Sequence, residues 1–166
     1  EVYKSEAGYA DLNGALRSVK GDFDAVDPAH AGTASALQSA IAEHGKPYGK
    51  DLEPLTRGER GSNLPSHSAT IGDEFVEDGF GSWSSSATQA TEFAVTYNRG
   101  KPDLSKQATV LRVKDGTGKS NVLTGNDYES EYILGSGTRY KVTGITEVRS
   151  DGAKPFVGRI MDVEIV

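Results

Sequence analysis

Two glutamates, Glu129 and Glu131, stand two residues apart where the polar stretch N-D-Y-E-S-E runs into the apolar Y-I-L. In an extended backbone, side chains alternate between faces with a period of two, so both carboxylates are predicted to point to one side and Ser130 to the other. One carboxylate of such a pair can stabilise positive charge on a sugar carbon while the other orients or deprotonates a nucleophile. The pair therefore indicates glycosidic-bond chemistry. The alternative is a solvated acidic edge, the commoner meaning of an isolated E-x-E.

Arg57 ends a short strand predicted at residues 52–57, and Gly58 follows it directly. The arginine fork can bind a phosphate group while the bare glycine backbone approaches a ligand. The ordinary alternative is a surface arginine beside a turn glycine.

A serine, Ser82, lies in the strand-like stretch G-F-G-S-W-S, ahead of a predicted helix. Serines that precede a helix usually cap it, and residues 84–86 fit that role. Ser82 comes earlier in the chain, so its hydroxyl is available for another function.

Three helices are predicted to support these residues. The first covers residues 6–20, where apolar side chains recur at steps of three and four until Gly21. The second covers residues 33–44, with Thr33 or Ser35 as its cap and Gly45 just past its end. The third follows the serine cluster and carries on one side Ala87, Ala90, Phe93, Ala94 and Tyr97.

Beyond residue 100 the chain is predicted to form strands, and Asp151-Gly152 joins the last two as a hairpin. These strands cover residues 108–113, 121–123, 131–134, 140–148 and 156–165. Helices first and mainly antiparallel strands afterwards predict an α+β fold, with two small packed sheets and the helices on one side. The length of 166 residues predicts a single domain, 1–166.

The composition argues against several classes of function. A formal charge of −6 disfavours broad binding to nucleic acid or anionic membranes, so a protein partner ranks higher. The chain has no cysteine, and His30, His44 and His67 lack metal-binding spacing, so we expect no metal. No apolar run is long enough for a membrane span. Residue 1 is glutamate, so we expect a mature chain or an excised domain without a signal peptide.

Taken together, three motifs resemble the mono-ADP-ribosyltransferases of the Arg-Ser-Glu class, which includes bacterial toxins and secreted effectors. L-T-R-G at 55–58 is similar to the first-strand arginine motif of that family. G-F-G-S-W-S at 79–84 resembles its phenylalanine followed by Ser-Thr-Ser, with Trp83 in place of threonine. The stretch at 126–142 resembles its catalytic loop, E-x-E motif and following strand. The motifs occur in the family's order, and the resemblance covers most of the chain, which implies the ADP-ribosyltransferase fold.

The resemblance implies a role for each motif residue. Glu131 would be the catalytic glutamate that stabilises charge on the ribose as nicotinamide leaves, and it would also hold the ribose hydroxyl. Ser82 would position this glutamate and so take part in binding NAD. Arg57 would bind the phosphates of NAD, and the Gly58 backbone would bond the nicotinamide amide. Glu129 matches the position that serves the acceptor in arginine-modifying members.

The resemblance also implies roles for two further residues. Phe93 falls where many family toxins place an aromatic ring that stacks on nicotinamide, but the residue equally suits a helix core. Arg99 is assigned as a second phosphate contact.

The expected function is transfer of ADP-ribose from NAD, as co-substrate, to an arginine of a target protein. The resemblance implies a bacterial toxin or effector that is secreted or injected and acts in the cytosol of a target cell, with an immunity protein as a further partner. Two alternatives stay open. One is NAD hydrolysis, or modification of a nucleic acid or small molecule, on the same scaffold; the other is a non-catalytic NAD-binding module.

Overall fold

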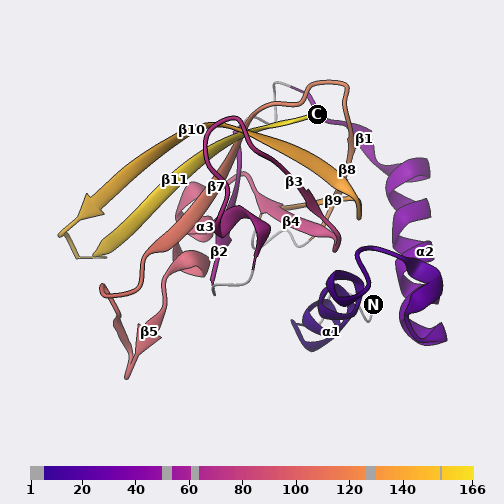
Figure 1. Ribbon diagram of the computed structural model, residues 1–166, viewed down its shortest axis with the longest axis horizontal. Coiled ribbons are helices and arrows are strands. Elements are labelled where there is room, and N and C mark those ends of the chain that lie inside the picture. Colours follow the sequence, from indigo (N-terminus) through magenta and orange to yellow (C-terminus); the bar gives the residue numbers. More distant parts are fainter. Residues whose placement is uncertain (1–5, 50–53, 61–63, 126–129, 154) are drawn as a thin grey trace.

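Two helices open the chain and a mainly antiparallel sheet follows, with a third helix between its strands (Figure 1). The computed structural model describes residues 6–49, 54–60, 64–125, 130–153 and 155–166. The α-helices are α1 (Glu6–Ser18), α2 (Pro28–His44) and α3 (Ala87–Ala94). The strands are β1 (Lys46–Pro47), β2 (Leu55–Glu59), β3 (Glu74–Glu77), β4 (Gly81–Ser84), β5 (Tyr97–Asn98), β6 (Lys101–Pro102), β7 (Ala108–Asp115), β8 (Asn121–Thr124), β9 (Glu131–Leu134), β10 (Thr138–Ser150) and β11 (Phe156–Ile165).

Nine strands form one hydrogen-bonded order, β1-β8-β9-β4-β2-β7-β11-β10-β3, while β5 and β6 form a separate hairpin. The junction between β4 and β2 is narrow, because a single residue pair, Thr56 with Ser84, joins them in the described part of the chain. The sheet therefore consists of a four-stranded half and a five-stranded half. Only β7 and β11 pair in parallel; the other described pairings are antiparallel.

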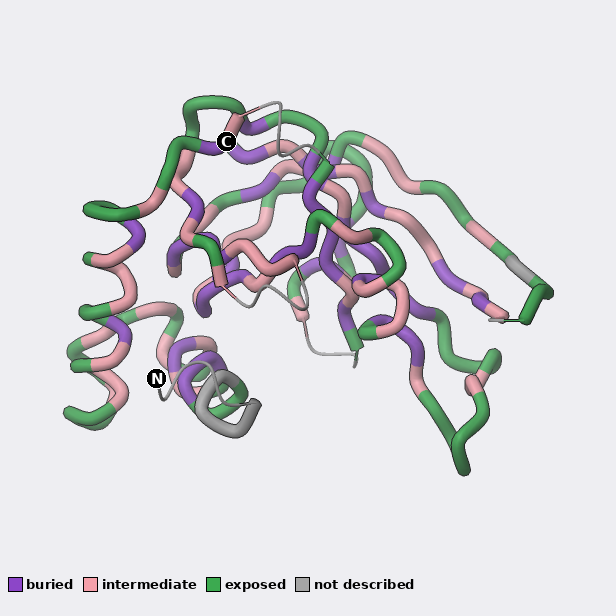
Figure 2. The backbone as a smooth tube through the Cα atoms, turned by 180° about the vertical axis from the view of Figure 1, so that it is seen from behind, coloured by how far each residue is buried: buried purple, intermediate pink, exposed green. Residues whose placement is uncertain are grey.

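The main hydrophobic core lies between the two halves. Trp83 and Leu134 come from the four-stranded half, and Leu55, Val113 and Met161 come from the five-stranded half. All five belong to one cluster of buried side chains. The predicted α+β fold with two small packed sheets is thus confirmed, and in Figure 2 buried residues recur along the strands in the middle of the molecule.

The helices cover the outer faces of both halves, so the expectation of helices on one side is wrong. On the four-stranded half, α1 and α2 enclose a cluster that contains Leu12, Leu16, Ala34, Ile41, Phe80 and Ile133. On the five-stranded half, Ala90 and Ala94 of α3 share a buried cluster with Ala108 and Val110 of β7. Because side chains alternate along a strand, each half has two apolar faces, and each outer face requires its own helical cover.

The second helix begins earlier than predicted. Asp27 caps it, and one carboxylate oxygen accepts hydrogen bonds from the backbone nitrogens of Ala29 and His30, both at 3.1 Å. Pro28 occupies the first turn, where its missing N–H costs no hydrogen bond. Thr33 is therefore an interior residue of the helix, and Asp-Pro was its start signal.

The third helix is shorter than predicted. Ser86 caps it as expected, accepting a hydrogen bond from the Gln89 backbone nitrogen at 3.4 Å. The helix ends at Ala94, so Tyr97 belongs to the β5–β6 hairpin, where its side chain is exposed. In the described residues, no helix is long and apolar enough to cross a membrane.

Candidate active site

Ser82 and Glu131 meet on adjacent antiparallel strands. In the register of β4 and β9, Glu131 lies opposite Ser84, and Ser82 lies opposite Ile133. The Ser82 hydroxyl reaches diagonally across the pair and donates a hydrogen bond to Glu131 Oε1 at 2.5 Å. Both side chains are partly exposed, so the carboxylate is held by the protein and still accessible to a ligand.

The Glu131 carboxylate packs against Gly125. The Gly125 backbone nitrogen donates a hydrogen bond to the Glu131 carbonyl oxygen at 2.9 Å, at the point where the chain enters β9. A Cβ at position 125 would overlap Glu131 Oε2 and lie 2.7 Å from its Cδ. The carboxylate thus lies over a bare Cα, a contact that no sequence motif indicated.

The backbone next to Glu131 departs from the predicted extended form. Ser130 has a φ of 48°, in the left-handed region, and its carbonyl accepts a hydrogen bond from the Ser85 nitrogen at 3.1 Å. The strand begins only at Glu131. The alternation that was expected to align Glu129 with Glu131 therefore does not apply across Ser130, and Glu129 lies outside the described residues.

Arg57 lies on β2 with its guanidinium enclosed between the two halves, since only 8% of the residue is exposed. Its Nε lies 3.5 Å from Glu59 Oε1, and its Nη2 lies 3.4 Å from Glu77 Oε2. A Cβ at Gly81 would lie 3.2 Å from Arg57 Nη1. Because Gly81 immediately precedes Ser82 on β4, the structure brings the predicted arginine beside the predicted serine motif.

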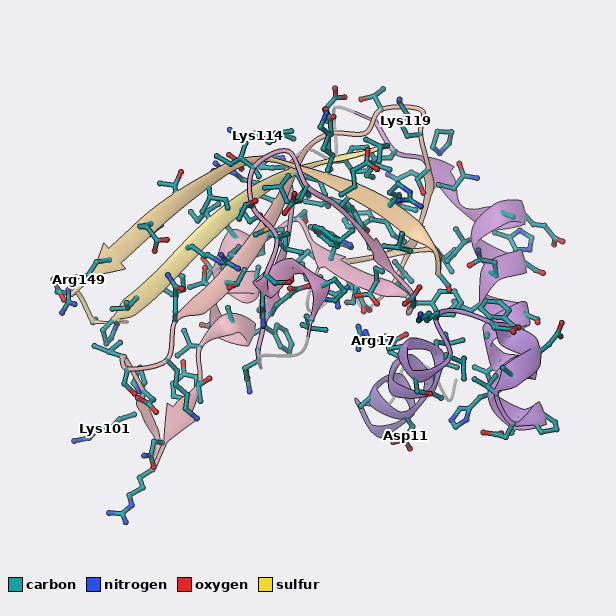
Figure 3. The ribbon with its side chains drawn as sticks, in the orientation of Figure 1. Asp11, Arg17, Lys101, Lys114, Lys119 and Arg149 are labelled. Atoms are coloured by element: carbon teal, nitrogen blue, oxygen red, sulfur yellow. The ribbon has the colours of Figure 1, made fainter. Side chains whose placement is uncertain are left out.

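Glu77 ends β3 and is a charged residue of the site that sequence reasoning missed. Its carboxylate accepts hydrogen bonds from Arg17 Nε at 3.0 Å, from Arg17 Nη2 at 3.1 Å and from the Gly79 nitrogen at 2.8 Å. In Figure 3, Arg17 lies on the side of α1 that faces the strands. Burial alone would raise the pKa of Glu77, but the charge of Arg57 and the bonds from Arg17 and Gly79 hold this pKa below its usual value.

Trp83, which stands in place of the family's threonine, is a core residue. Only 2% of it is exposed, and its ring packs on Tyr140 with the centroids 5.5 Å apart. Burial raises the pKa of Tyr140 strongly, so its phenol stays neutral. Side chains alternate along β4, so Trp83 faces the core between the halves and Ser82 faces the other side.

Gly58 is required by close helix packing. A Cβ at this position would overlap the Ala90 carbonyl oxygen and lie 2.6 Å from the Ala94 nitrogen, because α3 rests directly on β2. The same helix carries Phe93, whose carbonyl accepts a hydrogen bond from Arg60 Nε at 2.7 Å, just past the end of β2. The ring of Phe93 is 48% exposed, so the helix-core interpretation is wrong and the ring is available to a ligand.

Arg99 lies apart from the other predicted site residues. It occupies the turn of the β5–β6 hairpin with a φ of 52°, and the hairpin projects from the sheet (Figure 1). Lys101 on the same hairpin is far from Arg17 in Figure 3. The assignment of Arg99 as a second phosphate contact stays a prediction.

No protein-family model matches the chain, and no curated protein matches its sequence. Among solved structures, the chain resembles the Vis toxin, an ADP-ribosyltransferase from Vibrio splendidus, at 22% identity and a TM-score of 0.66; the match covers 99% of this chain and 70% of that one. It resembles Plx2a, an ADP-ribosyltransferase toxin from Paenibacillus larvae, at 14% identity and a TM-score of 0.69, over 99% of this chain and 82% of that one. The C3 exoenzyme of Clostridium limosum matches at 15% identity and a TM-score of 0.67, with coverage of 99% and 82%.

These similarities establish the fold. The chain has the ADP-ribosyltransferase fold that its motifs predicted, with Ser82 and Glu131 on adjacent strands. Within the described residues, no cluster of three or more histidine, aspartate or glutamate side chains could hold a metal ion.

Proposed function

We propose that the chain is a mono-ADP-ribosyltransferase that transfers ADP-ribose from NAD to an arginine side chain of a target protein and releases nicotinamide. The observation that carries this proposal is the 2.5 Å hydrogen bond from Ser82 Oγ to Glu131 Oε1. It lies in a chain with the fold of ADP-ribosyltransferase toxins. A carboxylate that is fixed before the reaction stabilises developing charge without having to reorganise.

The chemistry assigned to Glu131 follows from where charge develops. The bond between the nicotinamide nitrogen and the ribose carbon breaks, and its electron pair leaves with nicotinamide. Positive charge then grows on the ribose, and Glu131 stabilises this charge more than it stabilises the ground state. An acceptor nitrogen forms the new bond to the same carbon and loses a proton. Ser82 acts as a positioning residue through its hydrogen bond to Glu131.

NAD would be held by Ser82, Arg99 and Glu131 and by three further residues. Arg57 would bind the phosphates with its charged fork, and the Gly58 backbone would bond the nicotinamide amide. The exposed ring of Phe93 would stack on nicotinamide, a contact that a buried ring could not make. The solved structure of C3stau2 from S. aureus with NAD supports NAD as the co-substrate on this fold.

The side chain that accepts ADP-ribose is proposed to be an arginine. A guanidinium is a poor nucleophile while protonated, so a second carboxylate that binds it and accepts a proton is needed. Glu129 is assigned this role, although it lies outside the described residues. A solved structure of Vis in complex with agmatine supports the assignment, because agmatine carries a guanidinium group.

The setting is proposed from the same neighbours, several of which are toxins. We place the chain as the catalytic domain of a bacterial toxin or effector that is delivered to a target cell and acts in its cytosol on a protein. An immunity protein that blocks the site would be a further partner.

The test is incubation with labelled NAD and a cell lysate, followed by mapping of the modified side chain. Label on arginine supports the full proposal. Label on another side chain, on nucleic acid or on a small molecule would overturn the arginine assignment and keep the transferase. Release of nicotinamide without a labelled acceptor would indicate a hydrolase, and failure to cleave NAD at all would indicate a non-catalytic module.

A further inference from the structure

The Glu77 carboxylate joins three separate segments of the chain at the edge of the candidate site. Arg17 from α1 binds it through two hydrogen bonds, at 3.0 and 3.1 Å. The Gly79 nitrogen, just before β4, donates a third at 2.8 Å. Arg57 Nη2 from β2 lies 3.4 Å away. The side chain of Glu77 is only 7% exposed, so these groups replace nearly all of its water.

Arg17 alone would satisfy a carboxylate whose function was to anchor α1, because a bidentate guanidinium pair uses both oxygens. The presence of Arg57 as a second guanidinium is therefore informative. Arg57 also lies 3.5 Å from Glu59, so carboxylates from two different strands contact Nε and Nη2 of the same guanidinium. Together they direct Nη1 toward Gly81, beside the Ser82 motif.

We propose that Glu77 is a positioning residue for NAD binding, which holds the Arg57 guanidinium in the orientation that receives the phosphates. The proposal rests on the proposed function. It assigns Glu77 no contact with NAD and no part in bond breaking, so its effect passes through Arg57. A guanidinium that is oriented before binding loses less side-chain freedom when the ligand arrives.

The test compares Glu77→Gln with wild type in NAD titration and in steady-state release of nicotinamide. Gln keeps the shape of the side chain but lacks the charge that attracts Arg57. We expect the dissociation constant and the KM for NAD to rise on the order of tenfold, within the range of couplings between contacting residues, while kcat changes by less than about threefold. In an Arg57→Lys background the same change should add little, because the group it positions is already altered.

Two further variants control for effects that do not arise from the contact between Glu77 and Arg57. Glu74→Gln is the matched control, because Glu74 lies on the same strand and its ion pair with Arg139 is exposed; NAD binding should not change. Glu77→Asp retains the charge but withdraws the carboxylate from Arg57, so it should weaken NAD binding even if Glu77→Gln does not fold.

An unchanged or lower dissociation constant in the folded Glu77 variants overturns the proposal and leaves the proposed function intact. An equal effect of Glu77→Gln with and without Arg57 overturns it as well, because the effect would then not pass through Arg57. If folded wild type neither binds nor cleaves NAD, the proposed function itself fails, and the role of Glu77 fails with it.

Discussion

Gly125 determines where the Glu131 carboxylate rests, although no motif marks it. Replacing it by alanine puts a methyl group where Glu131 Oε2 lies. The backbone of Gly125 is not in the left-handed region, so it tolerates alanine, and among the described residues the flexible Glu131 side chain is the group that has to move. A misplacement of about 1 Å at a reacting group can cost about a hundredfold in rate.

We therefore expect Gly125→Ala to lower nicotinamide release on the order of tenfold to a hundredfold while the midpoint of urea unfolding stays at or above the wild-type value. Adding Ser82→Ala to this variant should cost little more, because the hydrogen bond between Ser82 and Glu131 is already lost. Wild-type turnover in Gly125→Ala would show that the contact between Glu131 and Gly125 has no role in the reaction.

Glu129 is expected to serve the acceptor and not NAD. In Glu129→Gln, arginine transfer should collapse while slow hydrolysis of NAD persists, because water needs no group that orients a guanidinium and Glu131 still stabilises the charge. Nicotinamide release with and without an arginine-bearing acceptor measures both activities. Parallel loss of both in a folded variant would mean that the two carboxylates act as one unit, and retention of both would point to a different acceptor.

Helix α1 packs the core and also holds the segment that leads into β4 through two hydrogen bonds of Asn13. Asn13 is fully buried; its Nδ2 donates to the Phe80 carbonyl at 3.0 Å, and its Oδ1 accepts from the Phe80 nitrogen at 2.7 Å. The bonds fix the chain two residues before Ser82.

Asn13→Ala should lower the free energy of unfolding by on the order of 2 kcal/mol, because it leaves a buried donor and a buried acceptor without partners. Urea unfolding measures this loss, and Asp11→Ala on the exposed side of the same helix is the control. Equal unfolding midpoints for both variants would show that the hydrogen bonds of Asn13 contribute nothing to stability.

Local signals in the sequence predicted the elements well where apolar periodicity and turn residues agreed. The strand at 131–134 and the hairpin around Asp151-Gly152 match the structure, and the first helix is correct within two residues. Missed elements lack such signals: β3 reads E-F-V-E and its pairing with β10 joins distant segments.

Residues of the candidate site were likewise predicted where a local motif marks them and missed where no motif does. Glu131 and Ser82 were predicted because they stand in compact motifs. The pairing of Arg17 with Glu77 spans 60 residues and follows no periodic pattern, so only the folded chain reveals it. The contact between Gly125 and the Glu131 carboxylate likewise could not be predicted from the sequence, since it depends on the rotamer of Glu131.

Ion pairs that involve a partly buried carboxylate make the stability of the whole protein depend on pH. Asp162 on β11 is partly buried, which would raise its pKa, but hydrogen bonds and charge from Arg112 at 2.6 Å and from Lys114 at 3.3 Å hold this pKa below its usual value. A carboxyl group whose pKa is lower in the folded state stabilises the fold above its unfolded pKa, near 4. The contribution is lost as the pH falls through the folded-state pKa.

The difference in unfolding free energy between wild type and Asp162→Asn should thus be constant from pH 7 to about pH 5 and shrink below about pH 4. Urea unfolding at several pH values measures it. Asp151→Asn is the control, because its pair with Arg149 is exposed and should contribute little at any pH. A difference for Asp162→Asn that stays the same down to pH 3 would contradict the assignment.

The proposed transferase activity depends on cleavage of NAD by a fixed glutamate. The most direct measurement is the initial rate of nicotinamide release at saturating NAD, for wild type and for Glu131→Gln, with the folding of both verified by circular dichroism. We predict release by wild type and a rate lower by about a hundredfold or more in the variant, with little change in the dissociation constant for NAD. Equal rates in the two proteins would contradict the role of Glu131, and no release by folded wild type would contradict the transferase activity itself.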